Sequence, residues 1–299
     1  MTTFSGSPVD TFDSNALKVN KSSQRNLFNI LMTGLSGLCI TLAIIPLVLV
    51  LFYVTVNGLN RLDADLFTQL PPPPGLDGGG IANAIMGTFI VVAIATLIAV
   101  PVGVMCAIWL AEFGGDDTSI DEYVRFGVNI LAGVPSIIAG VFIYGLMVRP
   151  GRPGYSALAG GVALAVLMLP TIIRTTDEAL KIVPQDIRWA ALGVGASKYQ
   201  TVLKVVLPAA IPAILTGVTL AIARAAGETA PLIFTALFSP FWPNGIFNPI
   251  ATLAVLVYNF AILPFKPQQE LAWAASLILV LLVLITSIIA RFVTRQKTY

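Results

Sequence analysis

The sequence predicts an all-α, polytopic membrane protein with six transmembrane helices, and three observations support this prediction. The 299-residue chain is 57% hydrophobic and only 11% charged, whereas soluble domains carry about 25% charged residues. Its mean hydropathy is +0.88. Charge-free stretches recur along the chain, and each is long enough for a helix that crosses a bilayer core of about 30 Å.

These stretches predict the spans in order. The six expected spans are Leu27–Val56, Ile81–Ala111, Tyr123–Val148, Tyr155–Leu180, Leu207–Phe234 and Leu271–Phe292. Ser239–Pro249 contains three prolines and cannot form a regular helix. Ile250–Leu263 is too short to span a bilayer and fits a re-entrant or interfacial segment, which leaves seven spans as the alternative count.

The basic residues predict the orientation, because Lys and Arg near span ends favour the cytoplasmic side. With six spans, one side holds Lys18, Lys21, Arg25, Arg125, Lys181, Arg188, Lys198, Lys204, Arg291, Arg295 and Lys297. The other side holds Arg61, Arg149, Arg152 and Lys266. Both termini are therefore expected in the cytoplasm, with polar tails at residues 1–26 and 293–299.

The longest predicted outer loop, Asn57–Gly80, contains the stretch PPPPGLDGGG. Four consecutive prolines favour a stiff polyproline segment, and the glycines after them favour a flexible joint. We expect this loop to act as a spacer, with contact to an external partner as the alternative.

Several functions are disfavoured by what the sequence lacks. It has no histidine, and Cys39 and Cys106 lie inside apolar stretches, so we expect neither a metal site nor a histidine proton relay. The net charge of +2, without a basic stretch, argues against nucleic-acid binding. The phosphate-binding pattern G-x-x-x-x-G-K-[ST] is absent, so an ATPase would have to be a separate subunit.

The largest predicted cytoplasmic loop, Asp177–Pro212, is too polar to span the membrane and has a helical pattern. Pro184 is suited to a helix start. Ile187, Ala190, Ala191 and Val194 then recur at helical spacing. Glycines at 193 and 195 break this helix, and a second amphipathic piece covers Lys198–Val206. Such an elbow could dock into a groove of a partner or lie on the bilayer surface.

The stretch RAAGETAPLIF places Arg224 and Glu228 inside an otherwise apolar region. A charge in the middle of a membrane costs roughly 2.5–3.5 kcal/mol on insertion scales. Residues four apart on a helix can pair, and the small residues between them allow another helix to approach closely. Pro231 should interrupt the helix one turn later. The pair could line a polar path or fix helix packing; arginine donors suit a tetrahedral oxyanion.

The elbow stretch WAALGVGASKYQTVLKVVLP resembles the EAA loop of bacterial ABC importer permeases. Residues in register with that loop are Ala190, Ala191, Gly195, Leu207 and Pro208. The stretch departs at Trp189, where the family often has Glu, and at Val205, where Ile is common. The resemblance implies that these five residues dock an ATP-binding subunit. It also implies a type I ABC importer permease core over residues 81–292, with residues 27–80 as an added span and outer loop.

The stretch RAAGETAPLIFTALFSPFW also resembles a signature of the A-type permease family of the bacterial high-affinity phosphate importer. RTTDEAL (Arg174–Leu180) resembles a second segment of that family and repeats the Arg/Glu spacing at Glu178. The resemblance implies that Arg174, Arg224 and Glu228 line the phosphate path. For Arg174 the alternative is an interfacial side chain that reaches water.

Together, these resemblances imply a non-catalytic permease of an ATP-driven phosphate importer in the bacterial cytoplasmic (inner) membrane. The implied partners are a second permease in a heterodimer, two ATPase subunits that bind ATP and Mg, an extracytoplasmic phosphate-binding protein and membrane lipid. No cofactor is expected in this chain. Sulfate or molybdate is the alternative cargo. An ATP-independent secondary anion transporter and a structural membrane protein are the alternative classes.

Overall fold

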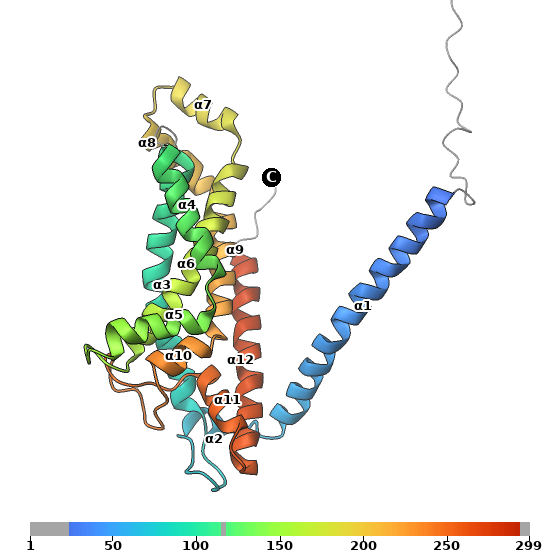
Figure 1. Ribbon diagram of the computed structural model, residues 1–299, viewed down its shortest axis with the longest axis vertical. Coiled ribbons are helices and arrows are strands. Elements are labelled where there is room, and N and C mark those ends of the chain that lie inside the picture. Colours follow the sequence, from blue (N-terminus) through green and yellow to red (C-terminus); the bar gives the residue numbers. More distant parts are fainter. Residues whose placement is uncertain (1–23, 115–117, 294–299) are drawn as a thin grey trace, which may run out of the picture. The chain divides into compact units, whose positions relative to one another are not determined.

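The computed structural model describes residues 24–114 and 118–293, and this part of the chain contains helices and no strand (Figure 1). The α-helices are α1 (Gln24–Leu59), α2 (Ala64–Thr68), α3 (Ala82–Ile108), α4 (Thr118–Gly133), α5 (Ser136–Ile143), α6 (Ala157–Ile182), α7 (Gln185–Gly193), α8 (Lys198–Thr201), α9 (Leu207–Ala226), α10 (Ala230–Thr235), α11 (Leu253–Ala261) and α12 (Lys266–Val293). Three π-helical turns follow α3, α5 and α8: η2 (Trp109–Phe113), η3 (Tyr144–Val148) and η4 (Val202–Val206).

The two predicted polar tails fall largely outside the described residues. Residues 1–23 and 294–299 are not described, while α1 already begins at Gln24 and α12 ends at Val293. The chain divides into two units, residues 1–53 and 54–299. Of the first unit, the structure describes most of α1, an apolar helix that contains Pro46 and whose described side chains are mostly exposed.

The second unit is a helical bundle built around α6, the most buried of its long apolar helices among the described residues. Glycines set the close contacts. A Cβ added at Gly103 would lie 2.8 Å from Ile172, and one added at Gly217 would lie 2.2 Å from Thr175. Because apolar side chains gain little from leaving lipid for protein, membrane helices associate through such close backbone packing. The glycines thus let α3 and α9 pack directly on α6.

The third predicted span, Tyr123–Val148, is wrong as a single helix. The structure bends it by 104° between Gly133 and Ser136. Pro135 cannot donate a backbone hydrogen bond, and it disfavours helical geometry at Val134 before it. Five helices are long and apolar enough to cross a membrane, and the bent pair counted as one span brings the number in the described chain to six, as predicted.

The fifth predicted span, Leu207–Phe234, is also two helices. α9 ends at Ala226, and α10 begins at Ala230 with Pro231 in its first turn, so the predicted interruption at Pro231 is confirmed. α10 packs against α5, because Gly140 leaves room for the Pro231 backbone: a Cβ added at Gly140 would lie 2.5 Å from the Pro231 Cα. The break between the helices α9 and α10 therefore lies inside the bundle.

The proline-rich segment after α10 is irregular, as predicted, and it caps the start of α6. The first amides of a helix have no partner inside that helix. Here the amide of Ala157 donates to the carbonyl of Asn248 at 3.1 Å, and the amide of Leu158 donates to that of Ile246 at 2.9 Å. The following helix α11 is short and largely buried. The expectation that it is re-entrant or interfacial stays a prediction.

The polyproline stretch of the loop that we expect to act as a spacer packs against α12. Gln268 of α12 is fully buried. Its side chain accepts a hydrogen bond from the amide of Gly75 at 3.1 Å and donates one to the carbonyl of Pro73 at 3.1 Å. Two hydrogen bonds from one buried side chain hold Pro71–Pro74 against the bundle. The alternative role of this loop, contact with an external partner, stays a prediction.

Candidate functional site

Arg224 and Glu228 lie at the break between α9 and α10. Arg224 is in the last turn of α9, where the negative end of the helix dipole favours a cation. Its Nε donates to Oε1 of Glu228 at 3.5 Å. The Arg224 side chain is 68% exposed, whereas that of Glu228 is 18% exposed. The predicted pair therefore forms, but as a long contact that leaves most of the guanidinium open.

The neighbours of this pair place it near the middle of α6. Arg224 and Glu228 line a crevice together with three residues of α6: Leu167, Met168 and Thr171. Thr171 lies near the middle of α6, which is one of the helices long enough to cross a membrane. The charged pair is thus far from both ends of the bundle.

The crevice itself is too small for an oxyanion. Its volume is about 10 Å³, which is the smallest volume that holds a single water molecule. Any larger ligand would have to meet Arg224 on its open side. There the guanidinium continues an exposed stripe at helical spacing, which consists of Ala213, Thr216, Leu220 and Arg224 of α9 and of Gly227 directly after it.

Arg174 is the second predicted path residue, and it lies one turn further along α6. It is three residues after Thr171, which corresponds to a rise of about 4.5 Å. Its Nη2 donates to Oδ1 of Asn129 on α4 at 2.7 Å. The Arg/Glu spacing therefore does not repeat the ion pair at Arg224, because Arg174 contacts Asn129 and Glu178 is exposed.

Arg174 lines a polar pocket of about 340 Å³ between α4 and α6. Its lining residues are Leu110, Arg125, Val128, Asn129, Ile173, Arg174, Asp177 and Glu178. Arg125 donates to Asp177 at 3.0 Å, and Lys181 donates to the same carboxylate oxygen at 2.5 Å. Two of the four charged residues in the lining, Arg125 and Asp177, therefore neutralise each other. Among the described residues, the side-chain partner recorded for Arg174 is the uncharged Asn129.

The elbow, Pro184–Val206, lies at one end of the bundle, which we call the elbow end; α2 lies at the opposite end (Figure 1). α7 ends at Gly193, and Gly195 turns the chain with a φ of +89°, a conformation that favours glycine. Ser197 and Gln200 then form a reciprocal capping box that starts α8. The predicted helix–Gly–helix shape is confirmed, although its second arm continues as the π-helical η4.

The predicted docking residues lie on and beside this elbow. Ala190, Gly195 and Pro208 are exposed, and Ala191 and Leu207 are half-buried. No residue of α7 is buried. Large apolar side chains of the elbow are exposed as well: Ile187, Trp189, Leu192, Val194, Tyr199 and Leu203. The elbow thus presents an apolar surface that the described chain leaves uncovered.

Sequence reasoning missed three residues that form contacts at the predicted path residues or at the elbow: Asn129, Glu112 and Arg188. Asn129 was an uncharged residue in a predicted span, and Arg188 entered only the count of basic residues. Arg188 binds Glu112 of η2 at 2.8 Å. A usable signal was that Glu112 is the first charge after a long apolar stretch, a position where an unpaired carboxylate is unfavourable.

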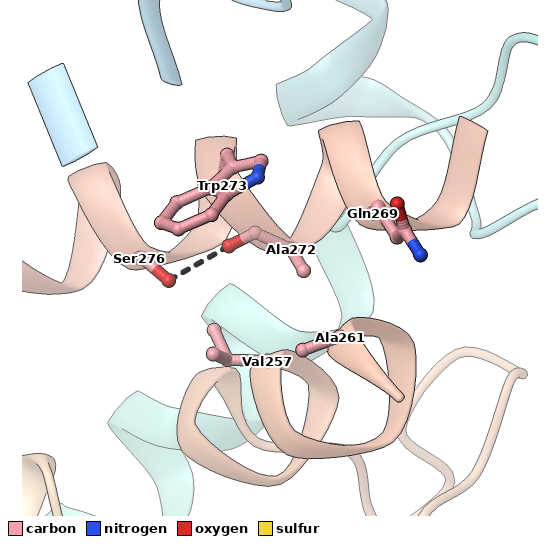
Figure 2. Close-up of a pocket in the computed structure, with 6 residues that line it drawn as sticks. All are labelled: Val257, Ala261, Gln269, Ala272, Trp273 and Ser276. Atoms are coloured by element: carbon pink, nitrogen blue, oxygen red, sulfur yellow. Dashed lines mark hydrogen bonds between the residues drawn. The ribbon is translucent and has the colours of Figure 1, made fainter. Parts of the chain in front are cut away.

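Another pocket of about 340 Å³ lies between α11 and α12 (Figure 2). Its lining residues are Val257, Ala261, Gln269, Ala272, Trp273 and Ser276, and the Ser276 hydroxyl donates to the Ala272 carbonyl at 2.8 Å. No charged residue lines it. It therefore offers no charged side chain to an anion, in contrast to the surroundings of Arg224 and Arg174.

Comparison with known proteins identifies one family. The model of the binding-protein-dependent transport system inner membrane component matches residues 99–299. The matched region contains α4–α12, and with them Arg174, the elbow and Arg224.

Two curated relatives are similar over most of their length. The phosphate transport system permease protein PstA of Yersinia pestis is 42% identical over 253 residues, which cover 85% of each chain. The protein of the same name in Haemophilus influenzae is 41% identical over 273 residues, covering 91% of this chain and 96% of that protein.

A solved structure shows the same fold. A chain of a bacterial alginate ABC transporter, in complex with an alginate pentasaccharide-bound periplasmic protein, aligns with a TM-score of 0.66. The alignment covers 92% of this chain and 97% of that chain at 12% identity. At this identity the likeness establishes the arrangement of helices and nothing about the cargo.

Proposed function

This chain belongs to the family of binding-protein-dependent transport system inner membrane components, and from that premise we propose that it is the permease subunit of an ATP-driven phosphate importer. The relatives named as phosphate transport permeases support phosphate as the cargo. The multi-pass helical structure supports a place in the inner membrane.

One observation carries this proposal: a largely exposed arginine lies at a helix break near the middle of the bundle. Among the described residues, the only recorded side-chain partner of Arg224 is Glu228, at 3.5 Å. Arginine presents five donors in a planar fork that fits phosphate oxygens. A charge at this depth has a free-energy cost, so an arginine placed there indicates a functional site. Open donors near the middle of a span favour transient anion binding over a structural role.

The path runs between this chain and a second permease, in our proposal. The crevice behind Arg224 admits no phosphate, so an anion would have to pass along the exposed stripe of α9. That stripe needs a facing surface to close it from lipid. A second, distinct permease supplies that surface in a heterodimer, and each chain provides half of the path. Arg174, one turn beyond Thr171 on α6, supplies a further positive charge for the anion.

The elbow docks the ATPase. Its exposed apolar side chains and its helix–Gly–helix shape suit insertion into a groove of a folded partner. Two ATPase subunits, which bind ATP and Mg, dock on the elbows of the two permeases. The elbow end then faces the cytoplasm, with both termini on that side. An extracytoplasmic binding protein delivers phosphate at the opposite end.

Transport follows from alternating access. ATP-driven closure of the ATPases tilts the two elbows and rocks the permeases, so that the path opens first to one side and then to the other. The arginines lower the electrostatic barrier for an anion without holding it tightly. This chain catalyses no chemical step.

Reconstitution tests the proposal. The complex of both permeases and the ATPases is placed in proteoliposomes with the binding protein outside, and uptake of radiolabelled phosphate is measured with and without internal ATP. We expect uptake that requires ATP and resists competition by sulfate and molybdate. Uptake without ATP would identify a secondary transporter, and efficient competition would reassign the cargo.

A further inference from the structure

Arg188 connects the elbow to two helices of the bundle. Its Nη2 donates to Oε1 of Glu112 and to the carbonyl of Leu180, both at 2.8 Å, and its Nη1 donates to the carbonyl of Val183. Leu180 and Val183 are at the end of α6, and Glu112 is in η2, directly after α3. One side chain on α7 therefore contacts the ends of both α3 and α6.

This contact is largely buried. The side chain of Arg188 is 13% exposed and that of Glu112 is 9% exposed. Leu180 is in the last turn of α6 and Val183 is its C-cap, so both carbonyls lie at the helix end where the dipole favours a cation. A planar guanidinium with three acceptors has little freedom to reorient, because its donors are fixed in one plane.

The second arm of the elbow contacts the neighbouring residue of η2. The ammonium of Lys198, at the start of α8, lies 5.5 Å from the centroid of the Phe113 ring. This distance is within the range of a cation–π contact. Both arms, α7 through Arg188 and α8 through Lys198, therefore contact adjacent residues of the same short π-helical turn.

η2 lies between the elbow and the bundle and is π-helical. π-helical turns have wider hydrogen bonding than α-helices and are frequent at functional sites. η2 continues α3, which packs directly on α6 through Gly103 and Ile172. A displacement of the elbow would therefore reach η2 first, and through it the two helices at the centre of the bundle.

We propose that the Glu112–Arg188 pair is the joint that transmits movement of the elbow to α3 and α6. Glu112 and Arg188 are positioning residues: they touch neither phosphate nor ATP, and they act by making the elbow and the ends of these helices move as one body. The inference rests on the proposed function, because it assigns the pair a role between ATPase docking and opening of the path.

A joint of this kind differs from a contact that only stabilises the fold. Loss of a stabilising contact lowers the yield of the complex, and both activities fall with it. Loss of a joint leaves a complex that still hydrolyses ATP but no longer moves phosphate. The ratio of phosphate transported to ATP hydrolysed therefore separates the two roles.

The test uses the complete complex in proteoliposomes, with Glu112→Gln as the main variant. Glutamine retains an acceptor of the same size but removes the charge that holds the guanidinium. Coupling between distant sites is typically worth about 5–150-fold, so we expect the transport ratio to fall about tenfold. The ATPase should still co-purify, because the exposed elbow surface is unchanged. Arg188→Lys is the second variant, and it should lower the ratio in the same way.

Glu122→Gln is the matched control, since it makes the same chemical change at an exposed position of α4. It should leave the ratio at the wild-type value. An unchanged ratio in both Glu112→Gln and Arg188→Lys would overturn the proposal, whether the complex yield is normal or reduced. Failure of the proposed function would show in the wild-type complex itself, as the absence of ATP-driven uptake, whereas failure of the joint would show only in the variants.

Discussion

Two arginine–glutamate pairs in this chain consist of the same two residue types but differ in exposure and in hydrogen bonding. At the break after α9, Arg224 is 68% exposed and touches Glu228 through a single contact of 3.5 Å. At the elbow, Arg188 is 13% exposed and binds Glu112 and two backbone carbonyls. The guanidinium of Arg224 makes one long hydrogen bond, whereas that of Arg188 makes three hydrogen bonds within the protein.

The difference shows that the surroundings of an arginine, rather than its carboxylate partner, decide its role. A largely buried guanidinium with three hydrogen bonds fixes the elements that it touches, because breaking a buried pair leaves an uncompensated charge. An exposed guanidinium with one weak contact can exchange that contact for a ligand. The positions of the two pairs agree with this division, since one lies near the middle of α6 and the other at the elbow.

The largest expected effect comes from removing the open charge. Arg224→Gln keeps hydrogen-bonding capacity but should lower phosphate uptake by about a hundredfold, the order that mutation of one stabilising charge or donor produces. The complex should still assemble, because Arg224 contributes little buried contact. Radiolabelled uptake and the yield of purified complex are measured together.

The double variant Arg224→Gln with Glu228→Gln sharpens this test. It restores neutrality but supplies no attraction for an anion, so uptake should stay low. Recovery of uptake in the double variant would show that the pair is structural, and the contrast with Arg188 would disappear.

A lysine exchange compares the two sites directly. Lysine retains the charge but not the planar fork. Arg224→Lys should lose about tenfold or less in uptake, because a point charge still attracts phosphate. Arg188→Lys should lower the midpoint of thermal unfolding of the complex, since one ammonium cannot reach three acceptors as a guanidinium does. Equal thermal stability of both variants and the wild type would contradict the distinction.

A smaller effect is expected at Asn129, the partner of Arg174. Asn129→Leu removes the acceptor at 2.7 Å and frees the arginine to reorient. A hydrogen bond to a charged group is worth about 1.5–3 kcal/mol, of which only part should appear in transport because the site is exposed. We expect a several-fold rise in the phosphate concentration that gives half-maximal uptake, with normal assembly. An unchanged half-maximal phosphate concentration would show that Asn129 does not contribute to the phosphate path.

The smallest effect is expected at Phe113, which supports the elbow through Lys198. An exposed cation–π contact contributes about 0.5–1 kcal/mol. Phe113→Leu should therefore reduce the phosphate-to-ATP ratio by two- to fivefold at most, well below the loss in Glu112→Gln. A loss as large as that of Glu112→Gln would transfer the main coupling role from the buried ion pair to the second arm.

The sequence around each proline did not show whether the helix continues or breaks there. Pro46, Pro101, Pro170 and Pro212 all lie inside continuous helices, whereas Pro135 accompanies a bend of 104°. A proline removes one backbone donor wherever it occurs. Whether the helix continues depends on the neighbouring helices, so the sequence could not separate Pro135 from the others.

The sequence by itself determined the membrane class, the approximate spans, the elbow and the candidate charges. Each of these follows from composition and short-range pattern. An uninterrupted apolar stretch has few stable backbone structures in a bilayer. A charged side chain within such a stretch has a free-energy cost and therefore indicates a functional position. The Arg224–Glu228 contact was predictable because its partners are only four residues apart in the sequence, although Glu228 lies just beyond the end of α9 rather than on the same helix.

Only the tertiary structure decided which long-range partners meet. Arg174 contacts Asn129 at a separation of 45 residues, and Arg188 contacts Glu112 at a separation of 76. These pairs depend on how α3, α4 and α6 pack, and that packing is set by shape at glycines such as Gly103 and Gly217. No local pattern carries this information, because the free energy of each contact depends on the backbone geometry that the whole bundle imposes.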